Sequence, residues 1–294
     1  MKTAETSATE LTALLGLLDE PDEGIFEKVR KRILLFGREA VKPLEEELSS
    51  VGSQEEYYRI EELIDEIVVN DAVSQMSEWK KSSKCDVTEG WIIVSEFLNR
   101  DMDKNAVKES VFDIFKDIWL EINENLTALE KIRVINHIIY KIHGFSETET
   151  SAETMMNYVI GSFLKYKSGN SVTMGMFYLS MAQRLGLPVF GVDLPHHFIL
   201  GYVDEHRKIK AAYEYAPSDV MFYINPLNRG AVFTKTEIDL YLKQYNIKAT
   251  PLYYTPADNV AVIRRYLNEL KQIWKKEDNQ RKVSYINNLC EVLF

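Results

Sequence analysis

The sequence predicts an α+β fold, in which a largely helical first half precedes a small antiparallel sheet and a final pair of helices. Before Gly186 the apolar residues recur at helical spacing, as Val107, Val111 and Ile114 do. After Gly186 come short apolar or aromatic runs separated by turn residues, which are typical of antiparallel strands. From Asn259 onwards the helical spacing returns.

The first 72 residues predict a separate segment of short amphipathic helices. Residues 33–48, ILLFGREAVKPLEEEL, resemble one HEAT-type unit, because a helix, a glycine turn and an Ala-Val-x-Pro-Leu helix follow in order. Ser53 and Glu56 have the spacing of a capping box at the start of a further helix. One or two units are too few for a solenoid, so the segment is either a docking surface or a helical cap on the main domain.

Three parts are therefore expected along the chain. They are the helical segment 1–72, a core of residues 73–256 with a helical lead-in and its main motifs within 155–232, and a C-terminal helical hairpin of residues 257–294. Strands are predicted at 188–192, 198–203, 211–215 and 220–224. Aromatic residues around them are expected to fill a core rather than line a pocket: Phe177, Tyr202, Tyr213 and Tyr215.

The composition is that of a globular protein with an acidic surface. The chain of 294 residues has a net charge of −10, which is unfavourable for binding a phosphate backbone, so no nucleic-acid partner is expected. No apolar run approaches the roughly 18 residues of a membrane span. The N-terminus lacks the basic start of a signal peptide. We therefore expect no membrane association and a cytoplasmic location.

No cofactor or metal is expected, because the sequence has no glycine-rich phosphate loop and no His-x-x-x-His spacing. Cys85 and Cys290 lie far apart, and we interpret them as two reduced thiols rather than a disulfide, a metal site or a catalytic group. His137 and His143 are expected to be packed or surface histidines rather than ligands.

Residues 167–202 have the features that surround a reactive thiol. A helix N-terminus lowers the pKa of a thiol placed there. A histidine on an adjacent strand takes the proton, and a third polar residue orients the ring. Ser171 begins an apolar helix, His197 begins a strand and Asn225 ends a later strand, so these are the candidate catalytic residues.

Two neighbouring residues are weaker candidates for the same chemistry. Thr173 falls within the first turn of the helix, and His196 precedes His197 in the sequence. If both histidines lie on one strand, they point to opposite faces, and only one of them faces Ser171.

A series of motifs resembles the transglutaminase-like superfamily, which shares a papain-like cysteine-protease core, and its SirB-type branch in particular. The motifs lie at residues 157–160, 169–175, 184–188, 191–198 and 224–230. The similarity covers about residues 75–294 and includes the C-terminal stretch RRYLNELKQIW. The resemblance implies a central helix packed on an antiparallel sheet, with large helical additions.

The resemblance also implies that the site is degenerate. In active members the position of Ser171 is a cysteine, and in the SirB-type branch it is usually a proline. His197 falls on the family histidine, and Asn225 falls where the triad aspartate is expected. A serine hydroxyl is not ionised at neutral pH, and a helix dipole worth ~0.3–1 kcal/mol does not change that. It therefore needs an aligned base and an oxyanion hole.

The resulting interpretation is a non-catalytic transglutaminase-like protein, a pseudoenzyme, that binds or regulates an unidentified protein or peptide partner. One alternative is a hydrolase or acyltransferase that acts on peptide or amide bonds through Ser171, His197 and Asn225. A second alternative is a scaffold that works only through residues 1–70.

Overall fold

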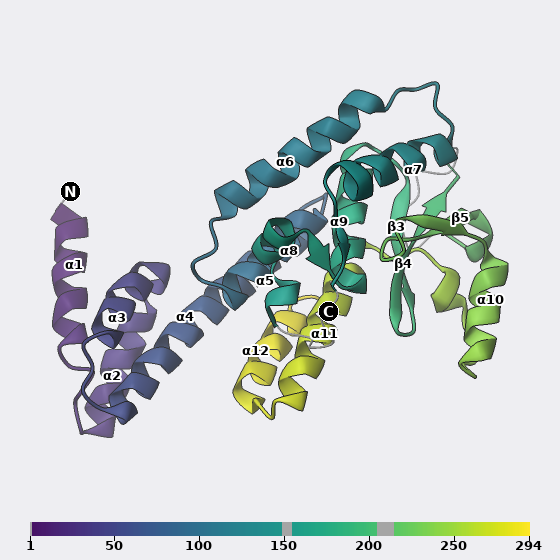
Figure 1. The fold of residues 1–294 in the computed structure, drawn as a ribbon. Helices are drawn as coiled ribbons and strands as arrows, with labels where there is room; N and C mark the ends of the chain where they lie inside the picture. The colour runs from purple at the N-terminus through teal and green to yellow at the C-terminus, as the bar shows by residue number, and fades with distance from the viewer. Residues whose placement is uncertain (1, 149–154, 205–214) are drawn as a thin grey trace. The chain divides into compact units, whose positions relative to one another are not determined.

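The computed structural model describes residues 2–148, 155–204 and 215–294, and the side chains from residue 9 onwards. The chain divides into two compact units, Met1–Gln75 and Met76–Phe294. Figure 1 follows the chain through both units. The second unit includes the C-terminal pair of helices, and the three-part division expected from the sequence stays a prediction.

The first unit is helical, as the sequence predicts. Its elements are α1 (Lys2–Leu15), α2 (Glu23–Leu34), the 3-10 helix η1 (Gly37–Ala40), α3 (Val41–Leu48) and α4 (Gln54–Lys81), which continues into the second unit. Gly37, the first residue of η1, has a φ of +56°, a left-handed conformation that suits glycine and changes the chain direction after α2. At the start of α4 the Ser53 hydroxyl accepts the Glu56 N–H at 3.2 Å. The likeness of this unit to HEAT repeats stays a prediction.

The second unit surrounds a small sheet with helices (Figure 1). Before the sheet come α5 (Val87–Leu98), α6 (Lys104–Glu121), α7 (Ala128–Asn136), the π-helical turn η2 (His137–Ile142), η3 (Met155–Tyr158), α8 (Ile160–Tyr166) and α9 (Ser171–Arg184). After it come α10 (Lys235–Gln244), η7 (Pro251–Tyr254), α11 (Asn259–Lys276) and α12 (Gln280–Glu291). Thr127 and Glu130 form a capping box at α7, which fixes its start.

The sheet is antiparallel throughout, with the strand order β3-β4-β5-β6. Its strands are β3 (Val189–Leu194), β4 (His197–Val203), β5 (Val220–Asn225) and β6 (Ala231–Phe233). A separate parallel pair joins β1 (Ser146–Glu147) to β2 (Ser168–Gly169). The sequence prediction missed β6, which has three residues and is too short to show an alternating pattern. Of the strand expected at 211–215, residues 211–214 lie outside the described residues.

The turn between β3 and β4 corrects one expectation about the histidines. Leu194 pairs with His197, so Pro195 and His196 form a two-residue turn. His196 has a φ of +62°, and proline followed by a positive φ is the pattern of a type II turn. His196 therefore does not lie on the strand beside His197, because the hairpin closes through it.

The two faces of the sheet pack against different helices. On one face, Ile199 of β4 and Tyr223 of β5 join a buried cluster with Ile238 and Leu242 of α10. On the other face lies α9, whose side chains from Val172 to Ala182 are all buried. Figure 1 shows α9 and α10 on either side of the strands. The predicted arrangement of a central helix on an antiparallel sheet is confirmed.

Phe198 of β4 lies between two glycines that let α9 approach the sheet. A Cβ atom on Gly175 of α9 would lie 2.2 Å from Cδ1 of Phe198, and one on Gly191 of β3 would lie 2.8 Å from its Cζ. Phe177, Tyr202 and Tyr215 are also buried, so these three fill the core as expected. Tyr213 lies outside the described residues.

We expect Gly175→Ala to destabilise the protein by about 1–3 kcal/mol, because the added methyl group overlaps the buried Phe198 ring. Chemical denaturation measures the change in the free energy of unfolding. Phe198→Leu removes part of the ring, so the double variant should lose less stability than the sum of the two single variants. Strict additivity would contradict the proposed contact.

Candidate functional site

The N-terminus of α9 is capped by Asn170 rather than by Ser171. Oδ1 of Asn170 accepts the N–H groups of Val172 and Thr173, each at 3.0 Å. The Thr173 hydroxyl in turn accepts the Asn170 N–H at 3.0 Å, which completes a reciprocal capping box. Serine is a preferred N-cap, so the start of the helix at Ser171 suggests that Ser171 caps it, but the structure gives this role to Asn170. The hydroxyl of Thr173, the weaker nucleophile candidate, is part of the cap.

Ser171 is the first residue of α9, and its hydroxyl contacts the backbone of β4. Its Oγ accepts the N–H of Phe198 at 2.7 Å and lies 3.4 Å from the carbonyl oxygen of the same residue, to which it donates. Strand β5 pairs with β4 only from Leu200 onwards. The start of β4 thus has a partner strand on one side only, and the serine hydroxyl supplies a hydrogen bond on the other.

His197 is half-buried and adjacent in sequence to the residue that Ser171 contacts. Phe198 points towards α9, so alternation along the strand directs His197 to the opposite face. There its ring meets the ring of Tyr241 of α10 edge-on, with centroids 5.3 Å apart. Burial lowers the pKa of His197 below 6.5, nearby His196 lowers it further, and Glu147 opposes the shift.

Asn225 ends β5, as the sequence predicts, and its side chain stabilises the turn that follows. Its Oδ1 accepts the N–H of Asn228 at 3.2 Å. Its backbone carbonyl accepts the N–H of Gly230 at 2.9 Å. Within the described residues no hydrogen bond joins the ring of His197 to Ser171 or to Asn225. The structure thus brings Ser171 to the backbone beside His197, but the three side chains do not form a bonded triad.

A buried polar network next to Asn225 was missed by the sequence reasoning. The Tyr178 hydroxyl of α9 donates to Oδ1 of Asn136 at 2.8 Å, and Nδ2 of Asn136 donates to the carbonyl of Gly230 at 2.9 Å. The Tyr140 hydroxyl donates to the carbonyl of Pro226 at 2.6 Å. Burial raises the pKa of Tyr178 and of Tyr140 far above the ordinary value, so both act only as neutral donors.

This network holds the β5–β6 loop against α7, η2 and α9. Gly230 has a φ of +70°, and a Cβ atom on it would lie 1.9 Å from Oδ1 of Asn136. Asn136 and Tyr140 lie in a stretch whose apolar spacing predicts a helix, and nothing in that spacing indicates their hydrogen bonds to the β5–β6 loop. The glycine at position 230 is the one feature of the sequence that indicates a close approach of the backbone to another part of the chain.

The remaining candidates from the sequence lie away from this site. His137 is exposed, and Nε2 of His143 lies 2.9 Å from Oδ2 of Asp117. Across the described ranges, no three His, Cys, Asp or Glu side chains gather in a way that could hold a metal ion. Among the helices of those ranges, none combines the length and the apolar character needed to cross a membrane.

The family is shown by comparison with known proteins. A family model described as the transglutaminase-like superfamily matches residues 105–268, more than half of the chain. The chain therefore belongs to the transglutaminase-like superfamily.

Among individual proteins, the chain is similar to UPF0162 protein YchA of Escherichia coli, with 27% identity over 210 residues, 70% of this chain and 72% of the relative. It is 25% identical to Protein SirB1 of Salmonella typhimurium over 203 residues, 68% and 70% of the two chains. It is 26% identical to mouse F-box only protein 21 over 145 residues, 49% and 22% of the two chains. No solved structure matches. The likeness to SirB-type proteins predicted from the motifs is confirmed.

We expect Ser171→Ala to lower the free energy of unfolding by about 1–2 kcal/mol, because the half-buried N–H of Phe198 loses its acceptor. Exposed Ser83 provides the matched control, and Ser83→Ala should change stability by less than about 0.5 kcal/mol. Equal stability of the two variants in chemical denaturation would show that the Ser171 hydrogen bond is absent in solution.

The lowered pKa of His197 gives a pH dependence with a definite sign. The unfolded chain binds the proton more readily than the folded chain, so this residue favours folding above about pH 6.5, and its contribution falls as the pH drops further. His197→Gln should therefore flatten the loss of stability between about pH 7 and pH 5. The measurement is denaturation across this range, with exposed His137→Gln as the control. An NMR titration giving His197 a pKa above 6.5 would contradict the assignment.

Proposed function

We propose that this chain is a non-catalytic member of the transglutaminase-like superfamily that acts by binding a protein or peptide partner. One observation carries the proposal. At the position where active members have the nucleophilic cysteine, the Ser171 hydroxyl both accepts from and donates to the backbone of Phe198. The side chain is used to join α9 to β4.

The other two candidate residues support the same conclusion. A serine nucleophile needs a base within hydrogen-bond distance and a third group that orients the base. The His197 ring instead contacts Tyr241 edge-on, and the Asn225 amide oxygen accepts a backbone N–H of its own turn. An amide in place of the family aspartate also stabilises an imidazolium less than a carboxylate does.

Neither cysteine replaces the missing nucleophile. Cys85 precedes α5, and Cys290 lies buried on α12. Burial raises the pKa of both thiols, which disfavours the reactive thiolate at neutral pH. Their positions and their raised pKa values thus favour a structural role for both cysteines over a catalytic one.

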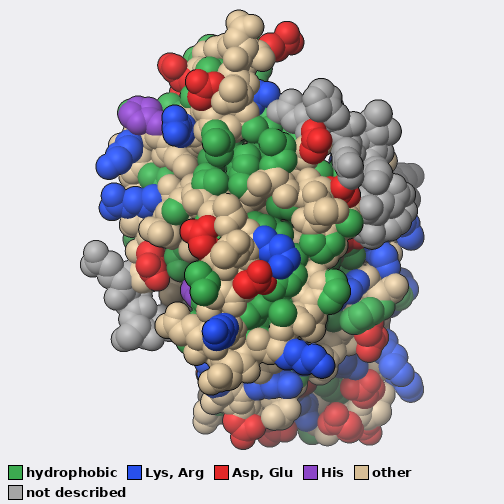
Figure 2. Space-filling model, turned by 90° about the vertical axis from the view of Figure 1, so that its right-hand side faces the viewer, with side chains coloured by type: hydrophobic (Ala, Val, Ile, Leu, Met, Phe, Trp, Pro, Cys, Tyr) green, Lys and Arg blue, Asp and Glu red, His purple; other side chains and the backbone are tan. Residues whose placement is uncertain are grey.

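Exposed apolar side chains support a role in binding. Figure 2 shows the side of the molecule that carries β5 and α10 in Figure 1, and hydrophobic side chains gather in the middle of this view. Exposed apolar residues on these elements and on β6 are Met221, Val232 and Leu240, and exposed Tyr245 directly follows α10. Apolar side chains that gather on a surface, as in this view, are typical of interaction sites. Strand β6 also ends the sheet, so its outer edge has no partner strand among the described residues.

The test is covalent labelling of the full chain by a fluorophosphonate probe, with hydrolysis and amine transfer measured on a set of glutamine peptides. We expect wild type and Ser171→Ala to label equally weakly and to show no turnover, because the Ser171 hydroxyl is bonded and lacks an aligned base.

The hydrolase alternative makes the opposite prediction. Labelling and turnover in the wild type that both Ser171→Ala and His197→Gln abolish, while Ser83→Ala retains them, would overturn the proposal. Circular dichroism of each variant shows that loss of activity is not loss of fold.

A further inference from the structure

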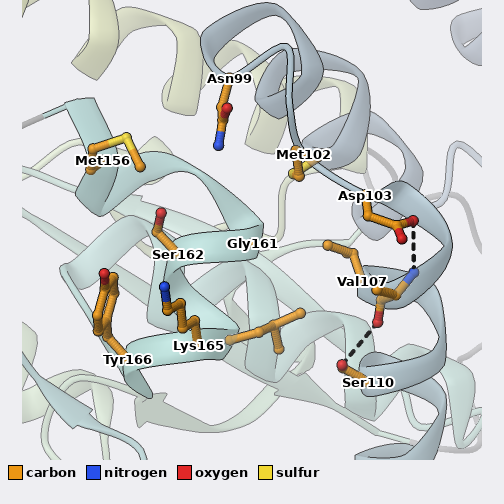
Figure 3. Close-up of a pocket in the computed structure, with 12 residues that line it drawn as sticks. Asn99, Met102, Asp103, Val107, Ser110, Met156, Gly161, Ser162, Lys165 and Tyr166 are labelled. Carbon is orange, nitrogen blue, oxygen red and sulfur yellow. Dashed lines mark hydrogen bonds between the residues drawn. The ribbon is translucent and has the colours of Figure 1, made fainter.

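A pocket in the second unit lies apart from the family site, between α6, the segment that precedes it, and α8. It has a volume of about 390 Å³, within the range of small-molecule sites in proteins. Figure 3 shows the residues around it, with Asn99 and Met102 on one side and Ser162, Lys165 and Tyr166 of α8 on the other. Met156 of η3 also lines the pocket.

Polar groups with hydrogens to donate lie on both sides of this pocket. In Figure 3 the Asn99 amide nitrogen points towards α8, and the Ser162 hydroxyl points back towards it. The Lys165 ammonium and the Tyr166 hydroxyl lie beside Ser162. Within the described ranges none of these four donor groups has a hydrogen-bond or ion-pair acceptor. Lys165 also lies 5.3 Å from the centre of the Tyr166 ring, which holds the two side chains together.

The charges of the pocket favour a single negative group. Lys165 is the one cation among the lining residues, and Asp103 is the one anion. The Asp103 carboxylate caps α6, accepting the N–H groups of Asn105 at 2.9 Å and Ala106 at 3.1 Å. Its charge is thus offset by the helix N-terminus, on the far side of Gly161 in Figure 3. Among the described residues no carboxylate pairs with the ammonium of Lys165, which lies over the ring of Tyr166.

The other lining residues are apolar except Ser110, whose hydroxyl donates to the carbonyl of Ala106 at 2.9 Å. Met102, Met156, Val107 and Leu164 contribute to the pocket, and methionines adapt to unbranched chains of varied shape. A phosphate dianion would find a single cation and thioether sulfurs, a poor match for its charge. A carboxylate has one negative charge and two acceptor oxygens, which fit a pocket that offers one ammonium and three neutral donors.

We propose that this pocket binds a carboxylate carried on a short apolar chain, with Lys165, Ser162, Tyr166 and Asn99 around the carboxylate and the methionines against the chain. The ligand is either a free carboxylic acid or the C-terminus of a peptide that ends in an apolar residue. The pocket includes neither Ser171 nor the exposed apolar residues of β5, β6 and α10, so it is independent of the proposed function.

The test is isothermal titration of the full chain with sodium octanoate, below its micelle concentration, and with octanamide as the neutral isostere. We expect octanoate to bind about tenfold or more tightly than octanamide, because only the carboxylate makes a charge-assisted hydrogen bond. Lys165→Met should abolish this difference, and Tyr166→Phe should reduce it. Lys243→Met removes an exposed lysine outside the pocket and should leave both affinities unchanged.

A second pair of ligands identifies the source of the carboxylate. A hexapeptide that ends in leucine is titrated as the free acid and as the amide. Tighter binding of the free-acid peptide than of octanoate assigns the pocket to a peptide C-terminus, and the reverse order assigns it to a small carboxylic acid.

Three outcomes would overturn the proposal. They are no saturable binding of either carboxylate up to about 10 mM, equal affinity for each acid and its amide, and affinities that Lys165→Met leaves unchanged. Binding of inorganic phosphate in preference to octanoate would also contradict it. Thermal unfolding of each variant confirms that the lysine substitutions leave the fold intact.

Discussion

The close approach of α9 to β4 at Phe198 is the constraint on which the second unit depends. The Phe198 ring occupies space that Gly175 and Gly191 leave free, and its N–H and carbonyl are both bonded to the Ser171 hydroxyl. One residue is therefore fixed by packing on its side chain and by hydrogen bonds on its backbone. Because α9 is buried over most of its length, its position determines where α5, α11 and the sheet pack around it.

The same constraint is consistent with the proposed non-catalytic role, because it engages the Ser171 hydroxyl in hydrogen bonds to the backbone of β4. A cysteine at the start of α9 would present a reactive thiolate to the adjacent strand. A serine there is small and makes stronger hydrogen bonds, so in this chain it joins the helix to the strand. His197 and Asn225 keep their places in the topology, yet their side chains pack on Tyr241 and close the turn at Asn228. In this structure all three side chains make packing contacts or hydrogen bonds of their own.

Polar groups far apart in the sequence hold the loop after β5 in the same way. Asn136, Tyr178 and Gly230 share two hydrogen bonds within the protein, and the Tyr140 hydroxyl bonds to Pro226 beside them. Buried hydroxyls and amides are costly when unpaired, so such a network allows few alternative loop positions. The π-helical turn at His137–Ile142 places Tyr140 for this contact.

The sequence by itself determined the helical first unit, the antiparallel sheet after Gly186, the chain positions of Ser171, His197 and Asn225, and the family. These features follow from periodicity, caps and ordered motifs, all of which are local. It missed β6, placed His196 on a strand and did not identify Asn170 as the cap of α9. Tertiary structure alone decided that the Ser171 hydroxyl bonds to Phe198, that His197 faces Tyr241, and that donors from α8 and Asn99 line one pocket. These contacts depend on which faces of elements far apart in the sequence pack together. The type of a side chain does not by itself determine which residue it will contact.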